Sequence, residues 1–496
     1  MDLMLQKIIG RYDETSQVAK SDGLNLYVRI FNLIREMIVK QDLPEHNVLP
    51  PSRALAEGLG VSRSTIIRVY EFLRLEGFVE SKPGSGHQIK SIQRTVGRAP
   101  VNTKARYPSI SRLGTSFLNN SSLINSTDDK SVAFRPGLPP LDIFPVTQWK
   151  NLSNLYWKSI QLSNLSYSPS SGIDQLKSNI ANYLNLSRDL KCDPSQVVIV
   201  AGSVQSLYLI GSSLLDEGDS VVMENPTFPN VHSIFTGLMA SVSGVDIDAQ
   251  GIKVDELRSS KIRPKLIHTT PSCHYPTGVS MSVERRKELL AYASDNDSLI
   301  IENDYEHEIN NWGNKTPTIF SLDEQDRTIY LGTFNRLLHP SLRIGYMVVP
   351  HYLQNVIEAL LKHSHRFVPT SIQVVLNQFI EKKYLYAHIK KVAEVSKVRQ
   401  QFFNTEFNQL FIDQGFRIEP SSKLSLQTLV KIPEGDLDKD LVNLFAKHNI
   451  ITHSYNKCFT QSSTEQGLIM GHGSIRTPMI KSKLRQMMQI YVRYKK

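Results

Sequence analysis

Hydrophobic residues near the start of the chain recur at helical spacing. From Leu26 to Lys40 they form one stripe, at Leu26, Ile30, Leu33, Ile34, Met37 and Ile38. A stripe of this kind predicts a helix that packs one face on a core. The stretch PSRALAEGLG predicts a second, short helix that buries Leu55 and Leu59 and ends at Gly60.

A third helix is predicted directly after this turn. Ser62 is a good N-cap, and the inward stripe of the helix is Ile66, Val69, Tyr70 and Leu73, up to an end at Gly77. Phe78–Ser81 and His87–Lys90 flank the glycine-rich turn Lys82–Gly86, which predicts a short hairpin. The order indicates a helix-turn-helix followed by a wing.

From about Ser131 the pattern changes to short apolar runs separated by longer amphipathic stretches. The runs predict buried strands: VVIVAGS, DSVVMENP, PKLIHTTPS, SLIIENDY, TIYLGTF and RIGYMVVP. Helices such as VERRKELLAYASDN lie between several of them. Alternation of this kind predicts an α/β domain around a mostly parallel sheet, with ligands beyond the carboxyl ends of the strands. Near the C-terminus, KLSLQTLVKI and GLIMGHGSI predict strands and RTPMIKSKLRQMMQIYVRY a terminal helix of a smaller α+β domain.

Composition adds that the protein is globular and divided into domains. At 496 residues, with 40% hydrophobic and 21% charged residues, two or three domains are expected. No apolar run reaches 18 residues, and the N-terminus lacks the features of a signal peptide. We therefore expect a cytoplasmic protein with no membrane partner. Cys192, Cys273 and Cys458 lack metal-ligand spacing, so free thiols and no metal site are expected.

Charge points to an anionic partner for the N-terminal end. Residues 1–112 carry 17 Lys and Arg against 11 Asp and Glu, an excess of six out of the total of +10. On the third helix, Arg63, Ser64, Ile67 and Arg68 lie off the apolar stripe, where a recognition helix touches DNA. Any one of these arginines alone is a common solvated surface charge. Together with the wing they favour double-stranded DNA as the partner.

The run LPPSRALAEGLGVSRSTIIRVYEFLRLEGFVESKPGSGHQI resembles the winged helix-turn-helix of the GntR family of bacterial regulators, over residues 24–90. The resemblance implies operator binding, and association with the nucleoid when bound. It also implies DNA contacts from Arg53, Arg63, Ser64, Thr65, Arg68, Gly84 and Gly86.

A second resemblance covers roughly residues 133–496. FRPGLPPLDIFP, AGSVQSLYLI, LLDEGDSVVMENPTF, TPSCHYPTGVSMSVERRKELL, IENDY and GTFNRLLHPSLRIGY are similar to motifs of fold-type I aminotransferases, which use pyridoxal phosphate. A GntR reader joined to such a domain is typical of the MocR group of regulators. The expected domains are an N-terminal extension (1–23), the reader (24–90), a flexible basic linker (91–132), a large domain (133–380) and a small domain (381–496).

The resemblance also assigns the residues of a cofactor pocket. Ser203, Val204 and Gln205 open a helix after a strand, where backbone N–H groups bind a phosphate. Phe228 takes the place of the aromatic residue that stacks on the pyridine ring, Tyr305 that of the phenol bonded to the ring hydroxyl, and Arg343 that of the phosphate arginine.

The pocket lacks the residue that aminotransferase chemistry needs most. The family has Gly-Thr-Phe-Ser followed by the lysine that holds the cofactor as a Schiff base, whereas this chain has Asn335 and Arg336 after Gly332-Thr-Phe. A guanidinium stays protonated and is a poor nucleophile, so Arg336 forms no imine.

A second replacement agrees with the first. Asn303 stands where the family has the aspartate that keeps the ring nitrogen protonated. An amide can hydrogen-bond that nitrogen but supplies no charge. We therefore expect a degenerate site with no enzymatic activity and no covalent cofactor, in which pyridoxal phosphate binds, if at all, as a non-covalent ligand.

Alternatives for this domain stay open at the level of the sequence. In one, Arg336 binds a small anionic effector. In another, it fills the old cavity with a salt bridge to Asp304 or Glu302, and the domain is a dimerisation scaffold. A third, an enzyme that uses pyridoxal phosphate without the lysine, is disfavoured by both replacements. The resemblance implies a homodimer that reads two half-sites.

Overall fold

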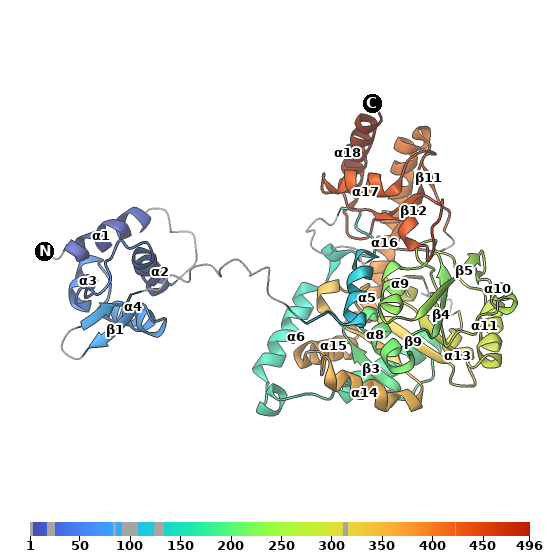
Figure 1. The fold of residues 1–496 in the computed structure, drawn as a ribbon, viewed down its shortest axis with the longest axis horizontal. Helices are drawn as coiled ribbons and strands as arrows, with labels where there is room; N and C mark the ends of the chain where they lie inside the picture. The colour runs from blue at the N-terminus through green and yellow to red at the C-terminus, as the bar shows by residue number, and fades with distance from the viewer. Residues whose placement is uncertain are drawn as a thin grey trace. The chain divides into compact units, whose positions relative to one another are not determined.

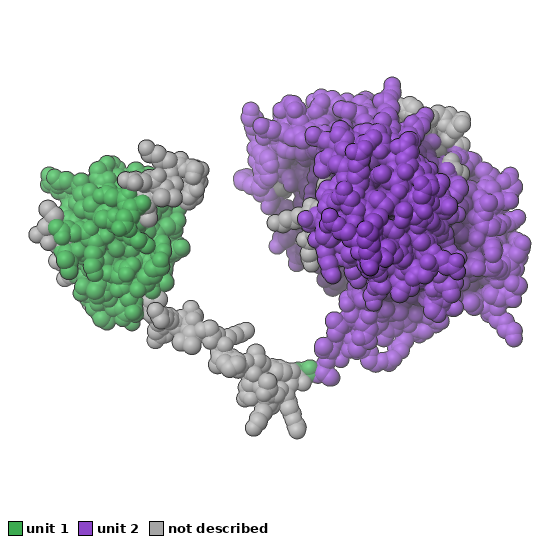
Figure 2. Space-filling model, turned by 90° about the horizontal axis from the view of Figure 1, so that it is seen from above, with its two compact units in different colours: residues 1–108 green, residues 109–496 purple. Residues whose placement is uncertain are grey.

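The computed structural model describes residues 3–16, 25–82, 86–91, 108–123, 133–310, 316–421 and 423–496. The chain forms two compact units, residues 1–108 and residues 109–496 (Figure 2). Each unit has its own hydrophobic core. Within the described residues, no helix combines the length and the apolar character that crossing a membrane requires.

Unit 1 has the predicted order of helices followed by a hairpin. Its elements are α1 (Leu3–Ser16), α2 (Leu26–Val39), α3 (Ser52–Gly58), α4 (Arg63–Leu75), β1 (Val79–Lys82) and β2 (Gly86–Ile89). The predicted stripes on α2 and α4 are buried, apart from Leu26 at the start of α2. β1 and β2 pair antiparallel, with Val79 opposite Ile89.

The structure corrects the N-terminal boundary of this unit. Residues 1–23 were predicted as an extension outside the reader, but Met4 and Ile8 of α1 are buried in the same core as α2, α3 and α4. Ile9 lies against Gly58, where an added Cβ would meet its side chain at 2.5 Å. Leu5, Ile9 and Tyr12 pack against the same core, so α1 has an apolar stripe at helical spacing that the prediction missed.

Unit 2 is built on an eight-stranded sheet of order β3-β10-β9-β8-β7-β4-β5-β6. All six predicted strands are present: β3 (Val197–Val200), β4 (Ser220–Asn225), β7 (Leu266–Thr269), β8 (Leu299–Asn303), β9 (Thr328–Thr333) and β10 (Gly345–Val348). β5, β4, β7, β8 and β9 pair parallel in that order, whereas β6 runs antiparallel to β5 and β10 runs antiparallel to β3 and β9. The prediction missed β5 (Ser241–Asp248) and β6 (Gly251–Ile252), because β5 is mostly polar and only half-buried.

Helices cover both faces of the sheet (Figure 1). The helices of the large part of unit 2 are α6 (Val146–Lys158), α7 (Asp174–Arg188), α8 (Ser203–Leu214), α9 (Pro229–Gly237), α10 (Val254–Ser259), α11 (Val283–Asp295), α12 (His307–Asn310), α13 (Ile319–Leu322), α14 (Gln354–His363) and α15 (Thr370–Glu381). On β3, Ile199 packs with α7 and α15, and its neighbour Val200 packs with α8 and α14. Successive strand residues thus face opposite layers of helices.

The C-terminal part forms a smaller α+β lobe, as predicted. A four-stranded antiparallel sheet has the order β11-β12-β14-β13, with β11 (Arg417–Ile418), β12 (Gln427–Lys431), β13 (His453–Ser454) and β14 (Gly467–Gly471). It packs on α16 (Tyr384–Phe411), α17 (Asp438–Ala446) and α18 (Thr477–Lys495).

The structure also corrects the predicted linker, residues 91–132. Within it, α5 (Arg112–Asn120) is a helix capped by Ser111 that packs on α9. The Phe117 ring lies so close to Gly237 that an added Cβ would meet it at 2.5 Å. Ser116 Oγ donates to the Thr236 carbonyl at 3.0 Å, and Ser233 Oγ donates to the Asn120 carbonyl at 3.1 Å. Polar residues dominate α5, so its sequence resembles that of a solvated linker.

Candidate functional site

The outer face of α4 carries the predicted DNA-binding residues. Ser62 caps the helix by accepting a hydrogen bond from the Thr65 N–H at 3.2 Å. Arg63 and Ser64 are exposed in the first turn. Arg63 Nε donates to Ser52 Oγ of α3 at 3.4 Å. Thr65 is half-buried, with its hydroxyl 2.8 Å from that of Ser62, so it stabilises the start of the helix.

Arg68 has a packing role that the sequence did not indicate. Its guanidinium carbon lies 4.0 Å from the centroid of the Tyr27 ring and 6.0 Å from that of Phe72. Stacking of this kind holds the planar fork in one orientation on the surface of the unit.

The remaining reader residues lie in α3 and the wing. Arg53 is exposed on α3, and Gly86 opens β2 at a φ of 79°, which suits glycine. Gly84 lies outside the described residues.

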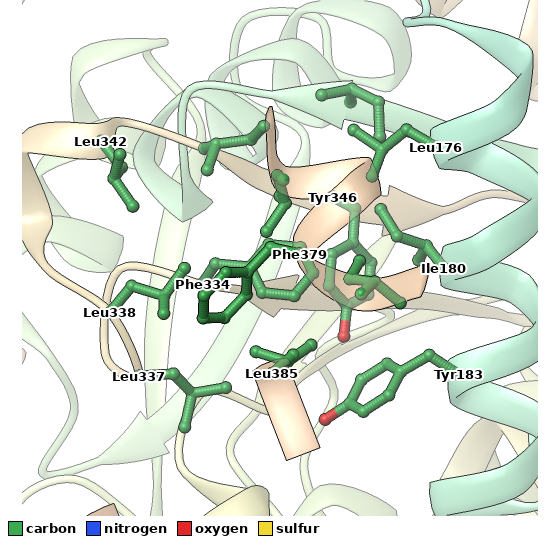
Figure 3. Packing of buried hydrophobic residues seen from close by; sticks show 14 of the residues in the cluster. Leu176, Ile180, Tyr183, Phe334, Leu337, Leu338, Leu342, Tyr346, Phe379 and Leu385 are labelled. Carbon is green, nitrogen blue, oxygen red and sulfur yellow. The ribbon is translucent and has the colours of Figure 1, made fainter. Parts of the chain in front are cut away.

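In unit 2, the carboxyl ends of three strands bring the predicted pocket residues together. Asn303 ends β8 and is followed by Tyr305, and Arg336 follows β9. Gly202 follows β3, and a Cβ added to it would lie 3.1 Å from the Asn335 amide. The loop that carries Arg336 is anchored in the core, because Phe334, Leu337 and Leu338 are buried in one cluster (Figure 3).

Arg336 is held on two sides. Its Nη1 donates to Glu306 Oε1 at 3.1 Å, and its guanidinium carbon lies 5.1 Å from the centroid of the Tyr305 ring. Gly137 allows this close approach, since a Cβ there would meet the guanidinium at 2.1 Å. The side chain is 20% exposed. Arg336 therefore forms a salt bridge, as one of the alternatives from the sequence expected, but its partner is Glu306.

Asp304 and Glu302 cannot serve Arg336 because each has its own buried partner. Asp304 Oδ2 accepts from Arg188 Nη2 at 2.6 Å and from the Tyr330 hydroxyl at 2.7 Å. Glu302 accepts the backbone N–H groups of Ile319 and Phe320 and lies 3.5 Å from Arg286.

Glu306 joins the Arg336 loop to the small lobe. Its Oε2 accepts from Ser425 Oγ at 2.9 Å and from the Leu426 N–H at 3.3 Å. Burial raises the pKa of Glu306, and the positive charge of Arg336 opposes this shift. Sequence reasoning missed Glu306 and Ser425. Glu306 lies next to the singled-out Tyr305, but nothing in the sequence pairs Arg336 with it.

Asn303 faces another neutral group. Its Nδ2 lies 3.3 Å from His268 Nε2, and both side chains are buried. Burial lowers the pKa of His268 to about 3, so the imidazole is neutral near pH 7. This end of the pocket thus presents an amide and a neutral ring, where a charged partner would be needed to hold a proton on a pyridine nitrogen.

The aromatic residues of the pocket pack with the small lobe. The Tyr305 hydroxyl donates to the Cys273 carbonyl at 3.0 Å. Phe228 meets Tyr275 edge-on, with ring centroids 4.9 Å apart. Both tyrosines share a buried cluster with residues of the small lobe: Leu429, Tyr455, Cys458 and Ile469.

The helix α8 starts at Ser203, directly after the turn that follows β3, as predicted. Gly202 precedes the helix at a φ of 120°, a conformation that favours glycine. Gln205 folds its side chain back to accept the Ala201 N–H at 2.6 Å. Ser203 is half-buried and Val204 is exposed. On the Arg336 loop, Asn335 Oδ1 accepts the Ile344 N–H at 3.2 Å.

Arg343 belongs to the same loop, but unlike the buried residues Leu342 and Ile344 on either side, it is exposed. It has a left-handed backbone conformation with a φ of 50°, and its side chain is exposed in the single chain.

Comparisons with known proteins agree with this architecture. Residues 26–89 match the family described as bacterial regulatory proteins, gntR family, and residues 142–452 match aminotransferase class I and II. A protein named "Probable rhizopine catabolism regulatory protein MocR" from Rhizobium meliloti is 30% identical over 91% of this chain and 90% of its own length. The HTH-type transcriptional regulator YhdI of Bacillus subtilis is 28% identical over 93% and 95%.

Solved structures define the fold of unit 2. An archaeal alanine:glyoxylate aminotransferase has a TM-score of 0.68 at 23% identity, over 78% of this chain and 96% of its own. Unit 2 is thus a fold-type I aminotransferase-like domain. The chain belongs to the MocR-type transcriptional regulators, in which a GntR-family DNA-binding domain is joined to such a domain.

Proposed function

We propose that this regulator binds operator DNA through α4 and the wing, and that its aminotransferase-like half is a non-catalytic sensor. The observation that carries the second part is Arg336, which occupies the lysine position and is bound to Glu306. The residues present do not fit a covalently held pyridoxal phosphate. Since a guanidinium does not form the imine and Asn303 supplies no charge, the site lacks both groups that transamination uses.

Four exposed side chains of α3 and α4 are available to contact DNA: Arg53, Arg63, Ser64 and Arg68. Gly86, at the start of β2, lets the wing backbone approach a phosphate, and Gly84 is expected to contact the DNA as well. The half-buried Thr65 contributes through the start of the helix.

The sensor part is supported by the surroundings of Arg336. A guanidinium has five N–H donors in a rigid fork, and a carboxylate or phosphate matches that fork. Within the described part of the chain, Glu306 is the one acceptor in hydrogen-bond contact with it. The side chain is also 20% exposed, so a small anion can reach the remaining donors. The turn before α8 supplies backbone N–H groups as a second anion-binding element.

A scaffold without a ligand is the competing function, and the Arg336–Glu306 pair itself favours it. A guanidinium that is already neutralised and stacked on Tyr305 can simply fill the space of a lost cofactor. In both cases the protein acts as a homodimer. Residues 155–167 support an interface because they expose several large apolar side chains: Leu155, Trp157, Leu162, Leu165 and Tyr167.

Thermal unfolding of the full chain with and without pyridoxal phosphate separates the two functions. A sensor that binds it is stabilised by about 2.7 kcal/mol at a hundredfold excess over the dissociation constant. That rise in midpoint is lost in Arg336→Ala and kept in Lys287→Ala, on the surface helix α11. Inorganic phosphate serves as the second probe. No rise with either anion, and unchanged operator binding by Arg336→Ala, would leave the domain as a scaffold.

A further inference from the structure

Two apolar side chains of α4 lie outside the core: Ile67 in its middle and Leu75 at its end. Ile67 is 42% exposed in the middle of α4. The core of unit 1 is closed by the other stripe of the helix, at Ile66, Val69, Tyr70 and Leu73. Ile67 instead borders an open hollow of about 560 Å³ between α4 and the wing. Gly86 and His87 of β2 line its other side.

The surroundings of Ile67 combine cationic, acidic and apolar groups, since Pro50, Pro51 and the Glu71 side chain line the same hollow. Arg63 and Ser64 are exposed on the turn that precedes it, and Arg74 lies along the same hollow. Arg68, the next residue, turns away to stack on Tyr27 of α2. Ile67 therefore offers an exposed apolar side chain one turn after Arg63 and Ser64, which can donate to phosphates and base edges. This suits a surface that is negative but carries isolated apolar groups.

The major groove of DNA is such a surface. Among the base pairs it displays hydrogen-bonding groups and one apolar group, the 5-methyl of thymine. We propose that Ile67 contacts a thymine methyl group and so specifies a T·A pair in each half-site of the operator. The inference rests on the proposed binding of DNA by α4. It adds a residue that specifies sequence to arginines that mainly supply affinity.

The test removes single methyl groups from DNA. Duplexes are first selected from a random-sequence library with the full-length protein. Each dT of a selected duplex is then replaced by deoxyuridine, which lacks only the methyl, and the dissociation constant is measured by fluorescence anisotropy at one salt concentration. For the wild-type protein, we expect one position per half-site to lose about fourfold in affinity, the value of burying one methyl group.

Ile67→Ala is expected to bind the dT and dU duplexes equally at that position. Leu75→Ala is the matched control, since Leu75 is 75% exposed at the end of the same helix and should keep the fourfold difference. The inference is wrong if no dU substitution weakens the wild-type protein, or if Ile67→Ala still discriminates at the same position. Failure to select or bind any duplex would instead refute DNA binding itself, and the inference with it.

Discussion

At the residue scale, the site is defined by which ionisable side chains form ion pairs and which polar side chains are neutral. Arg336 could be singled out from the sequence because it interrupts a motif, and Asn303 for the same reason. Their partners could not, since Glu306 and His268 come from turns and strands whose meeting depends on the folded sheet. The choice of Asp304 or Glu302 as partner was wrong because buried Arg188 and Arg286 bind those two carboxylates.

The neighbouring carboxyl of Glu308 predicts a pH dependence of stability. Glu308 is buried, and burial raises its pKa to about 8. An unfolded glutamate loses its proton near pH 4.5, so the folded state keeps this proton longer and loses stability as the pH rises towards 8. We expect wild-type protein to lose about 1 kcal/mol more unfolding free energy than Glu308→Gln between pH 7 and 8.

The comparison with Glu308→Gln removes the contributions of the other buried groups. Burial lowers the pKa values of His268, His307 and His472 to about 3, 4 and 3, so these rings are neutral in the folded state, and their contribution is the same in both proteins. Glu302 has a pKa raised by burial to about 7, and its titration is common to the wild type and Glu308→Gln, so it cancels from their difference. Denaturant unfolding at several pH values measures the difference, with Glu358→Gln on the surface as control. Equal slopes for wild type and Glu308→Gln would contradict the burial argument.

Arg68 and Arg63 are expected to differ although both serve DNA binding. Arg68 stacks on Tyr27 at 4.0 Å, and an exposed cation–π contact contributes about 0.5–1 kcal/mol. Arg68→Ala should therefore weaken operator binding and also lower the free energy of unfolding of unit 1. Arg63→Ala should weaken binding alone and reduce the salt slope by about one. Denaturation and gel shift of both variants check this, and an unchanged stability of Arg68→Ala would rule out the packing role.

At the scale of elements, buried strands and amphipathic helices could be predicted from the sequence. The half-buried strand β5 and the polar helix α5 could not. The six central strands and the stripes of α2 and α4 were clear in the sequence because each buries a continuous or periodic apolar set. The prediction missed β5 because this strand is half-buried. It missed α5 because the contacts of this helix with α9 are made by one aromatic ring and hydroxyl groups.

The docking of α5 on α9 can be tested by proteolysis. Phe117 packs against Gly237 and lies 6.1 Å from Tyr208, measured between ring centroids. Its removal should cost about 1 kcal/mol of docking, which raises the open population about fivefold. We expect trypsin to cut at Arg112 about five times faster in Phe117→Ala. Leu118→Ala, which removes a side chain that is 62% exposed on the same helix, should match the wild-type rate. Equal rates for all three proteins would show that this ring does not hold the helix.

At the scale of the whole molecule, the chain joins a DNA reader to a fold that evolved for amino-group chemistry. Family membership and the fold of each unit were predicted from motifs and are confirmed by the comparisons. The boundaries were less accurate because the apolar stripe of α1 was not recognised and the sequence of α5 is mostly polar. The central claim is our proposal for unit 2, that its pocket has a fixed guanidinium where the related enzymes have a reactive amine.

Reductive trapping tests that claim most directly. The full-length protein is incubated with pyridoxal phosphate, reduced with borohydride and digested, and the stoichiometry of pyridoxyl adducts is measured peptide by peptide. We expect no stoichiometric adduct in the wild-type protein, while Arg336→Lys acquires one at residue 336 and serves as the positive control. One stoichiometric adduct on a wild-type lysine that reaches the pocket would contradict the account, because the site would then hold the cofactor covalently after all.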